Sequence, residues 1–204
     1  MMGAGTDHVS SPSLSPLATG LVIFALGFSA SLAGDACHVT SGTTMYLWPG
    51  VPKLWHSALW FPFLVGGAVL GVARAGIAAA LPGRPRTRLD ALAGSAAVLA
   101  LYALTASLRG QPSTVSVLLC GAVAVLIWAW WDPSRGALVL ALAASVLGPL
   151  AEIGIVALGA SRYAADASAL AGVAPWLPCL YFGAGAVASG LWRVIMHDGR
   201  TAPA

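Results

Sequence analysis

The stretch Trp128-Ala129-Trp130-Trp131-Asp132-Pro133-Ser134-Arg135 separates two apolar segments of the chain. An uncharged run that begins at residue 112 ends in its three indoles, and a second apolar run opens at residue 136. Tryptophan favours the membrane–water boundary because its ring is apolar while its N–H needs a polar partner. Asp132 precedes a proline, which disfavours the α conformation, so we expect the first helix to end there. The short link of residues 132–135 then predicts two antiparallel neighbouring helices.

The composition excludes an ordinary soluble domain. Of the 204 residues, 58% are hydrophobic and 8% are charged, and the mean hydropathy is +0.84. A soluble domain carries about a quarter charged residues, so we expect an integral membrane protein with one polytopic domain. The net charge of +3 comes from few residues and predicts no nucleic-acid surface. The three scattered cysteines are too few for a disulfide framework.

Six apolar segments are long enough to cross hydrocarbon about 30 Å thick, namely residues 17–34, 57–73, 91–108, 112–131, 136–160 and 175–192. They predict an all-α fold, a bundle of six transmembrane helices without strands. We assign residues 17–196 to this domain, residues 1–16 to a disordered tail and residues 197–204 to a C-terminal tail. The polar, turn-rich residues 35–55 form the longest predicted loop. A cleaved signal peptide is the rival interpretation of the first segment, but residues 1–16 lack the positive charge that it needs.

The cationic residues predict the orientation of the bundle. Six spans place both termini on one side of the membrane. With the termini in the cytoplasm, seven arginines are cytoplasmic and three cationic residues are not, the two groups being Arg74, Arg84, Arg86, Arg88, Arg135, Arg193 and Arg200 against Lys53, Arg109 and Arg162. This bias follows the positive-inside rule and predicts cytoplasmic termini.

Glu152 is the one carboxylate that lies well inside a predicted span. At about 1.5 Å per residue it lies roughly 24 Å along its helix, in the half away from the cytoplasm. An acid within a membrane is costly and therefore suggests a function. The alternative is a protonated or hydrogen-bonded glutamate that lines a polar crevice. Pro149 gives such a crevice a cause, because it frees a backbone carbonyl and kinks the helix.

The sequence offers little for catalysis or for metal binding. No spacing suggests a Ser/His/Asp or Cys/His arrangement, and neither CxxC nor HExxH occurs. Cys37-His38 is a single pair in the predicted loop, and Cys120 is interpreted as a small apolar residue. We therefore predict no enzyme activity, no metal and no cofactor.

Three segments carry a family resemblance. Trp176-Leu177-Pro178-Cys179-Leu180-Tyr181-Phe182-Gly183-Ala184-Gly185, continuing to Arg193, resembles the last membrane helix of the Insig (insulin-induced gene) family. That family has Trp-Leu-Pro-Cys, two aromatic residues, a Gly-rich stretch and an arginine in this register. Residues 128–135 resemble the end of its fourth helix, where a tryptophan pair is followed by Asp and then Ser-Arg. Ser57-Ala58-Leu59-Trp60-Phe61-Pro62 resembles the start of its second helix.

The resemblance implies a six-helix bundle with cytosolic termini. Eukaryotic members bind oxysterols in the membrane, retain the sterol sensor Scap in the endoplasmic reticulum and deliver HMG-CoA reductase for degradation. The family's aspartate after the fourth helix is needed for the Scap interaction, and Asp132 is the matching residue here. Glu152 falls where eukaryotic members carry Gln, if one gap is allowed. The short chain, rich in Ala and Gly, is similar to proteins of high-G+C bacteria, which lack Scap.

We therefore predict a non-enzymatic, lipid-binding bacterial homologue of Insig in the inner membrane. A cavity between helices, open sideways to the bilayer, would hold a sterol-like molecule or a neutral glycerolipid such as diacylglycerol. The candidate lipid-binding residues are the wall residues Trp60, Trp128, Phe182 and Gly185, each of which could instead serve ordinary helix packing, and the polar residues Gln111 and Glu152. A membrane-protein partner or a homo-oligomer would use Asp132 and Arg135.

Two alternatives stay open. The first is a small proton-coupled transporter that uses Glu152, although no internal repeat is visible to support it. The second is a tryptophan-rich sensory protein of the TspO type, which has five spans where six are counted here. For Asp132 itself, a local role as a helix cap or a surface ion pair with Arg135 is the alternative to partner binding.

Overall fold

The structure, a computed structural model, describes residues 14–80 and 83–197. Within these ranges, six helices are long and apolar enough to cross a membrane, and they are α1 (Pro16–Thr40), α2 (Trp60–Ala78), α3 (Arg88–Ser107), α4 (Ser113–Trp131), α5 (Arg135–Ala157) and α6 (Leu177–His197). The prediction of a six-helix membrane bundle is confirmed. The predicted tails lie largely in residues 1–13 and 198–204, outside the described residues, so their disorder stays a prediction.

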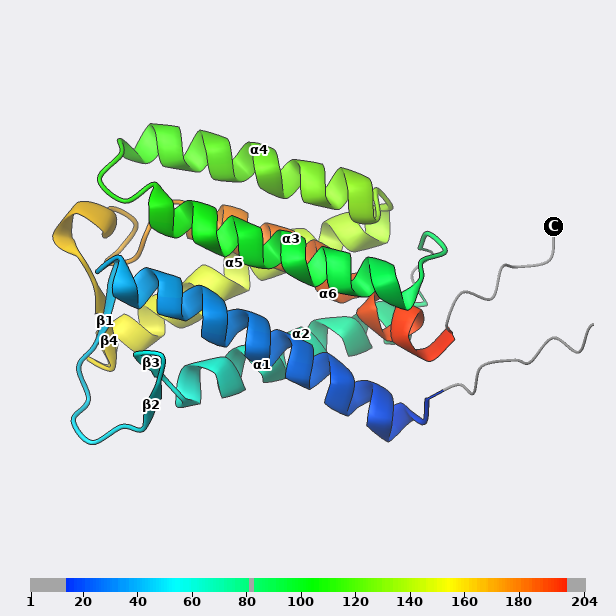
Figure 1. The fold of residues 1–204 in the computed structure, drawn as a ribbon. Helices are drawn as coiled ribbons and strands as arrows, with labels where there is room; N and C mark the ends of the chain where they lie inside the picture. The colour runs from blue at the N-terminus through cyan, green and yellow to red at the C-terminus, as the bar shows by residue number, and fades with distance from the viewer. Residues whose placement is uncertain (1–13, 81–82, 198–204) are drawn as a thin grey trace, which may run out of the picture.

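The two ends of the bundle differ in kind. At one end α1 begins and α6 ends, on the right of Figure 1, and we call it the terminal end. At the other end, on the left of Figure 1, the long connections carry short strands, and we call it the sheet end. Both ends of the chain's helical domain therefore lie on one side, as an even number of spans requires.

Four short strands correct the prediction of a bundle without them. β1 (Thr44–Tyr46) pairs antiparallel with β4 (Ser161–Tyr163), joining the two longest connections across the sheet end. β2 (Lys53–Leu54) and β3 (Ser57–Ala58) form a hairpin whose two turn residues, Trp55 and His56, both have positive φ. Strands of two or three residues are too short to show a period-2 pattern, so they could not be predicted from the sequence.

The first helix extends further than predicted. Residues 35–40 were expected in a loop, but α1 continues to Thr40 and carries both Asp35 and His38. These two polar residues lie three apart and so share one helix face. That face is buried, with Asp35 and His38 retaining only 3% and 4% of their exposure. Asp35 and His38, expected in a loop, therefore lie in the bundle interior.

Two other boundaries have identifiable local causes. α3 begins three residues before its predicted start, because Thr87 and Asp90 form a capping box in which each side chain accepts from the other's backbone N–H. α2 begins three residues later than predicted, because Ser57 and Ala58 belong to β3. α4 ends at Trp131, and Asp132 has an extended backbone, as the following proline predicts.

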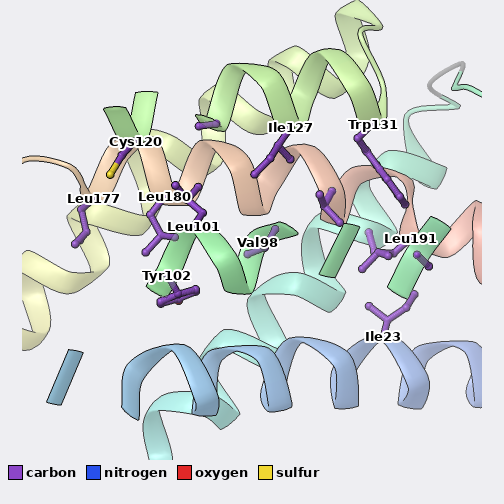
Figure 2. Packing of buried hydrophobic residues seen from close by; sticks show 14 of the residues in the cluster. Ile23, Val98, Leu101, Tyr102, Cys120, Ile127, Trp131, Leu177, Leu180 and Leu191 are labelled. Atoms are coloured by element: carbon purple, nitrogen blue, oxygen red, sulfur yellow. The ribbon is translucent and has the colours of Figure 1, made fainter. Parts of the chain in front are cut away.

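α6 is the central helix of the bundle. In its most apolar window 67% of residues are buried, against 33% or fewer in each of the other five helices. Its side chains Leu177, Leu180 and Leu191 meet Leu101 of α3 and Trp131 of α4 in one core cluster, seen in Figure 2. The remaining helices surround α6 and keep long apolar faces exposed, as expected for helices that contact lipid.

Candidate functional site

A cavity of about 490 Å³ lies between α1, α2, α5 and α6. Its lining is almost entirely apolar and rich in small side chains. The polar side chains among its lining residues are Ser31, Tyr102, Glu152 and Tyr181. A space of this volume is in the range of small-molecule ligand sites, which run from about 300 to 1,000 Å³.

The cavity opens sideways, between α2 and α5. Leu64 of α2 and Leu147 of α5 both line it, and they keep 50% and 65% of their surface exposed. Ala68 and Ala143, from the same two helices, also line it and are exposed. The mouth therefore lies on the face of the bundle that a bilayer would cover. We call this space the lateral cavity.

Close helix packing fixes the opposite wall. Gly185 of α6 lies so near α5 that an added Cβ would be 2.6 Å from the Cβ of Ala144 and 3.2 Å from the Cα of Ala141. A glycine is needed there because any side chain would push α5 and α6 apart. α5 and α6 therefore pack closely along one wall, and we call this contact the seam. At the mouth, α5 and α2 do not pack closely.

A small polar pocket adjoins the lateral cavity at the sheet end. It holds about 20 Å³ and is lined by residues of α1, α2, α3, α5 and α6 and of both strands of the β1–β4 pair. Five residues line both spaces, Phe61, Tyr102, Glu152, Leu180 and Tyr181. The polar pocket is therefore the closed inner end of the lateral cavity, and a molecule entering from the mouth would present its leading group there.

Two buried carboxyl groups face this polar pocket. Asp35 accepts a hydrogen bond of 2.6 Å from the Tyr46 hydroxyl, and Glu152 accepts one of 3.0 Å from the Tyr181 hydroxyl. Glu152 retains 7% of its exposure. Burial, and then the charge of Asp35, raise the pKa of Tyr46 far above its usual range, so Tyr46 stays a donor at any physiological pH.

His38 completes the polar wall beside Asp35. Its Nε2 lies 2.8 Å from the Oγ1 of Thr105 on α3, in a buried contact. Its ring also packs 5.4 Å from Tyr102 and 5.0 Å from Trp176. The hydrogen bond joins α1 to α3, so His38 fixes the wall of the pocket as well as lining it.

Two of the predicted lipid-binding residues line the lateral cavity. Glu152 and Gly185 do so from α5 and α6. Phe182 is half-buried and packs against the core cluster. Trp60 is half-buried in an aromatic group with Tyr46 at the sheet end. Whether any of these residues binds lipid stays a prediction.

Gln111 and Trp128 lie elsewhere and are not among the residues that line the lateral cavity. Gln111 is exposed in the turn between α3 and α4. Trp128 is half-buried near the end of α4, and its Nε1 has no hydrogen-bond partner among the described residues. The structure thus brings Glu152 and Gly185 together at the lateral cavity, while the other four predicted residues, Trp60, Gln111, Trp128 and Phe182, do not line it.

At the terminal end, Asp132 has a different partner from the one expected. It is buried, with 3% of its exposure left, and its Oδ2 lies 3.2 Å from Nη2 of Arg193 on α6. Its Oδ1 accepts from the backbone N–H of Ser134, 3.1 Å away. Of the local alternatives considered for Asp132, the cap is present in the bond to Ser134, while the ion pair is buried and formed with Arg193, because α6 brings its own arginine inward and Arg135 is exposed at the start of α5.

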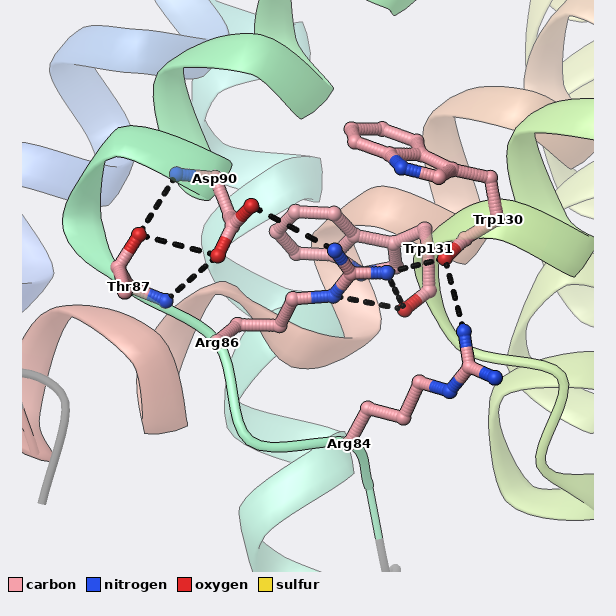
Figure 3. Close-up of polar contacts among 6 residues, drawn as sticks. All are labelled: Arg84, Arg86, Thr87, Asp90, Trp130 and Trp131. Carbon is pink, nitrogen blue, oxygen red and sulfur yellow. Dashed lines mark hydrogen bonds and ion pairs between the residues drawn. The ribbon is translucent and has the colours of Figure 1, made fainter. Parts of the chain in front are cut away.

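Arginines also cover the C-terminus of α4. Arg86 donates to the carbonyl oxygens of Trp130 and Trp131, forms an ion pair with Asp90 and lies over both indole rings (Figure 3). Arg84 donates to the Trp130 carbonyl as well. A guanidinium at this position satisfies carbonyls that the helix leaves without partners and faces the negative end of its dipole. Trp130 and Trp131 therefore bind an arginine through both their rings and their backbone carbonyls.

Eight polar residues around the polar pocket were not predicted as site residues, namely Asp35, His38, Thr44, Tyr46, Tyr102, Ser161, Tyr163 and Tyr181. One signal for them was in the sequence. Asp35 and His38 have the i, i+3 spacing of one helix face, provided that the first helix is extended past residue 34. The residues of β1 and β4 left no such signal, because a pairing between positions over a hundred residues apart has no local pattern. Among the described residues, no group of three His, Cys, Asp or Glu side chains could hold a metal ion.

Comparison with known proteins identifies the family. No family model matches the chain. The chain is 39% identical over 169 residues to an INSIG protein homolog of Mycolicibacterium vanbaalenii, covering 83% of this chain and 82% of the relative. Two crystal structures of MvINS, a mycobacterial Insig homolog from Mycobacterium vanbaalenii, superpose with a TM-score of 0.83 at 36% identity. They cover 92% of this chain and 98% of the other, and one is of a cross-linked trimer that carries an arginine-to-cysteine substitution. By sequence and by fold alike, the chain belongs to the Insig family.

Proposed function

We propose that this protein binds a membrane lipid in the lateral cavity and acts through that binding, without catalysis. One observation carries the proposal: an apolar space of about 490 Å³ opens between α2 and α5 and ends in a polar pocket. A lipid with an apolar body and a small polar head has this shape. The ligand class we propose is a sterol-like molecule or a neutral glycerolipid such as diacylglycerol.

The chemistry at the inner end argues against an enzyme. Asp35 and Glu152 each hold a tyrosine hydroxyl. No lysine or arginine lies among the residues that line the pocket, all of which are described, so no cation stands ready to stabilise a charge that develops on a reacting group. The only histidine that lines the pocket, within the described part of the chain, is engaged by Thr105. Binding is therefore the function that the arrangement supports best.

The two buried acids favour one second candidate, a proton-coupled transporter that uses Glu152. Such a protein would need an exit from the polar pocket as well as the mouth between α2 and α5. Neutralising Glu152 separates the two functions. A transporter with Glu152→Gln would lose coupled flux in proteoliposomes, whereas a lipid binder would change mainly in affinity.

We further propose that the terminal end faces the cytoplasm, in a bacterial inner membrane. The arginines gathered at that end support this orientation. In a cysteine-free background, a cysteine at Arg84 should react with an impermeant thiol reagent only after cells are opened. A cysteine at Pro49, in the connection at the sheet end, should react in intact cells. The reverse pattern would overturn the orientation.

Self-association is proposed from the relative alone, since one MvINS structure is of a cross-linked trimer. A homotrimer of this chain would be the simplest counterpart. Native mass spectrometry in a mild detergent would show a species of three chains, and a monomer at every concentration tested would contradict it. A different membrane-protein partner is the alternative use of the terminal-end residues Asp132 and Arg135.

The lipid proposal is tested by closing the mouth of the cavity. Ala143 is exposed on α5 and lines the cavity, so Ala143→Trp should obstruct the entrance. Leu142, the preceding residue, is also exposed but does not line the cavity, and Leu142→Trp is the matched control. Mass spectrometry of lipid retained per protein should show a loss in the first variant alone. Equal retention in both variants would contradict binding in the lateral cavity.

A further inference from the structure

A second apolar space lies between α1, α2 and α6 at the terminal end, where α1 begins (Figure 1). It is a groove of about 500 Å³, and we call it the terminal groove. Leu17 and Leu21 of α1 are exposed along its side, so it faces the lipid that surrounds the bundle. None of its lining residues lines the lateral cavity, and they are Pro16, Leu17, Gly20, Leu21, Phe24, Leu70, Arg74 and Trp192.

The terminal groove is charged near the terminal end and apolar in its deeper part. It follows α1 from Pro16 to Phe24, which is roughly 12 Å at about 1.5 Å per residue. Arg74 lies about one turn before the end of α2 at Ala78. From this depth an arginine side chain can extend its guanidinium to the level of the lipid head groups. Leu70 lies one turn deeper on α2 and continues the apolar part.

Arg74 is the only charged residue among those that line the terminal groove, all of which are described. Its guanidinium carbon lies 4.7 Å from the centre of the Trp192 ring, and that ring is buried. The contact uses the face of the guanidinium and holds the group in place, while the N–H donors stay at its edge. Within residues 14–80 and 83–197, these donors have no hydrogen-bond acceptor.

The carboxylates of the described chain do not neutralise Arg74, because each has another partner. At the terminal end, Asp90 pairs with Arg86, and Asp132 pairs with Arg193. The other three are bound at the sheet end, namely Asp35, Glu152 and Asp166. The positive charge of the terminal groove therefore lacks a counter-ion in the part of the chain that the structure describes.

We propose that the terminal groove binds an anionic phospholipid, whose phosphate accepts hydrogen bonds from Arg74. A guanidinium presents pairs of N–H groups that match two phosphate oxygens. An acyl chain of the lipid then lies along the apolar part, against Phe24 and Leu70. A phosphate that carries choline would bring a second cation beside Arg74, and a neutral lipid would bring no counter-ion. This inference goes beyond the proposed function and does not rest on it, because the two spaces share no lining residue.

The test measures phospholipid binding to the full chain, delipidated and purified in a mild detergent. Native mass spectrometry follows titrations with dioleoyl phosphatidylglycerol and with dioleoyl phosphatidylcholine, which share their acyl chains and differ in net charge. The parent protein should bind the anionic lipid about fivefold more tightly, since one arginine near an anionic membrane surface contributes about 1 kcal/mol. Inorganic phosphate should not compete, because it has no acyl chain to fill the apolar part.

A first pair of variants tests the charge. Arg74→Gln should remove the preference for the anionic lipid. Arg84→Gln is the matched control, since Arg84 is an exposed arginine at the same end and does not line the terminal groove. It changes the net charge equally and should keep the full preference.

A second pair of variants tests the groove. An added Cβ at Gly20 would lie 3.7 Å from Leu70 and 3.8 Å from the Trp192 ring, so Gly20→Leu fits the fold and fills the groove. This variant should weaken the binding of both phospholipids several-fold. Gly67→Leu is the matched control, since Gly67 is exposed on α2, has nothing within 4 Å of an added Cβ and lines neither space.

The outcomes separate the terminal groove from the lateral cavity and from other occupants. Equal binding of the two phospholipids by the parent protein would overturn the proposal, and so would a preference that persists in Arg74→Gln. Competition by inorganic phosphate would leave an anion site without a lipid. Loss of self-association in Gly20→Leu, without any lipid preference in the parent protein, would assign the groove to a second copy of the chain. Ala143→Trp should keep the preference, so failure of lipid binding in the lateral cavity would leave this proposal standing.

Discussion

The carboxyl groups at the two ends of the bundle have opposite surroundings. Asp132 at the terminal end is buried against the guanidinium of Arg193 and a backbone N–H. Asp35 and Glu152 at the sheet end are buried against tyrosine hydroxyls. A carboxylate paired with a cation inside the protein is bound to that partner, because removing either charge leaves the other buried without a compensating charge. A carboxyl group held by neutral hydroxyls is not bound to a fixed charge, and it has two oxygens with which it can accept further hydrogen bonds from a ligand.

The arginines at the terminal end stabilise the C-terminus of α4. Arg86 joins the connection after α2 to the last carbonyls of α4, over the faces of Trp130 and Trp131. The ion pair of Asp132 and Arg193 then joins the same corner to α6. The terminal end is therefore cross-linked by ion pairs and hydrogen bonds, whereas the sheet end encloses the polar pocket.

The largest predicted effect is at Asp132. Asp132→Ala removes the carboxylate from a buried pair, and we expect the free energy of unfolding in mixed micelles to fall by about 3 kcal/mol. This value is at the low end for buried pairs, because the Arg193 side chain is still 23% exposed. Lipid retained per folded protein should not change, since Asp132 does not line the lateral cavity.

Asp166 is the matched control for that substitution. Its pair with Arg109 spans 3.3 Å at the sheet end, but the Asp166 side chain is 52% exposed. Asp166→Ala should cost about 0–1 kcal/mol, as is usual for surface pairs. Similar losses in the two variants would mean that burial does not distinguish the acids, and the comparison of the two ends would fail.

The second prediction concerns the seam of α5 and α6, which joins the two ends. Gly185→Ala places a methyl group within 2.6 Å of the Ala144 Cβ and should cost about 1–3 kcal/mol by overpacking. Gly154 of α5 has nothing within 4 Å of an added Cβ, so Gly154→Ala should be neutral or stabilise by up to about 1 kcal/mol. Thermal unfolding in detergent compares the two. Equal midpoints would show that the seam can relax.

The sequence predicts the membrane spans but not the contacts between them. Apolar length alone predicted six spans, and the proline after Asp132 predicted where α4 ends. The start of α3 was predicted three residues too late. Apolar length alone takes no account of the capping box of Thr87 and Asp90, which extends α3 past the charge of Arg88. Nothing local in the sequence reveals that Gly185 meets Ala144, since that contact depends on how two helices pair.

The third prediction contrasts neutralisation at the two ends. Glu152→Gln keeps an oxygen that can accept from Tyr181, so its cost should be below about 1 kcal/mol. Asp132→Asn loses its charge beside Arg193 and should cost more. Chemical or thermal unfolding of both variants, measured side by side, decides the order. A larger loss in Glu152→Gln would mean that the charge at the sheet end is itself structural.

Only a small part of the candidate site could be predicted from the sequence, and the reason is physical. Glu152 stood out because an acid in an apolar run is costly, and Gly185 because a family motif carried it. Thr44 and Tyr46 could not stand out, since they reach the pocket only through the pairing of β1 with β4. Arg193 was predicted to lie on the cytoplasmic side of the membrane. Its pairing with Asp132 could not be predicted, because it depends on the central position of α6.

The smallest predicted effect is at Arg135, where partner binding can be separated from folding. Arg135 is exposed at the start of α5, and a cation at the N-terminus of a helix faces the positive end of its dipole. Arg135→Ala should therefore change the free energy of unfolding by no more than about 0.5 kcal/mol, and in the stabilising direction if at all. Lipid retention should also be unchanged. If the variant nevertheless loses the oligomer in native mass spectrometry, Arg135 belongs to an interface between chains. If the free energy of unfolding falls by several kcal/mol, the terminal end depends on a contact of Arg135 that its exposed position does not explain.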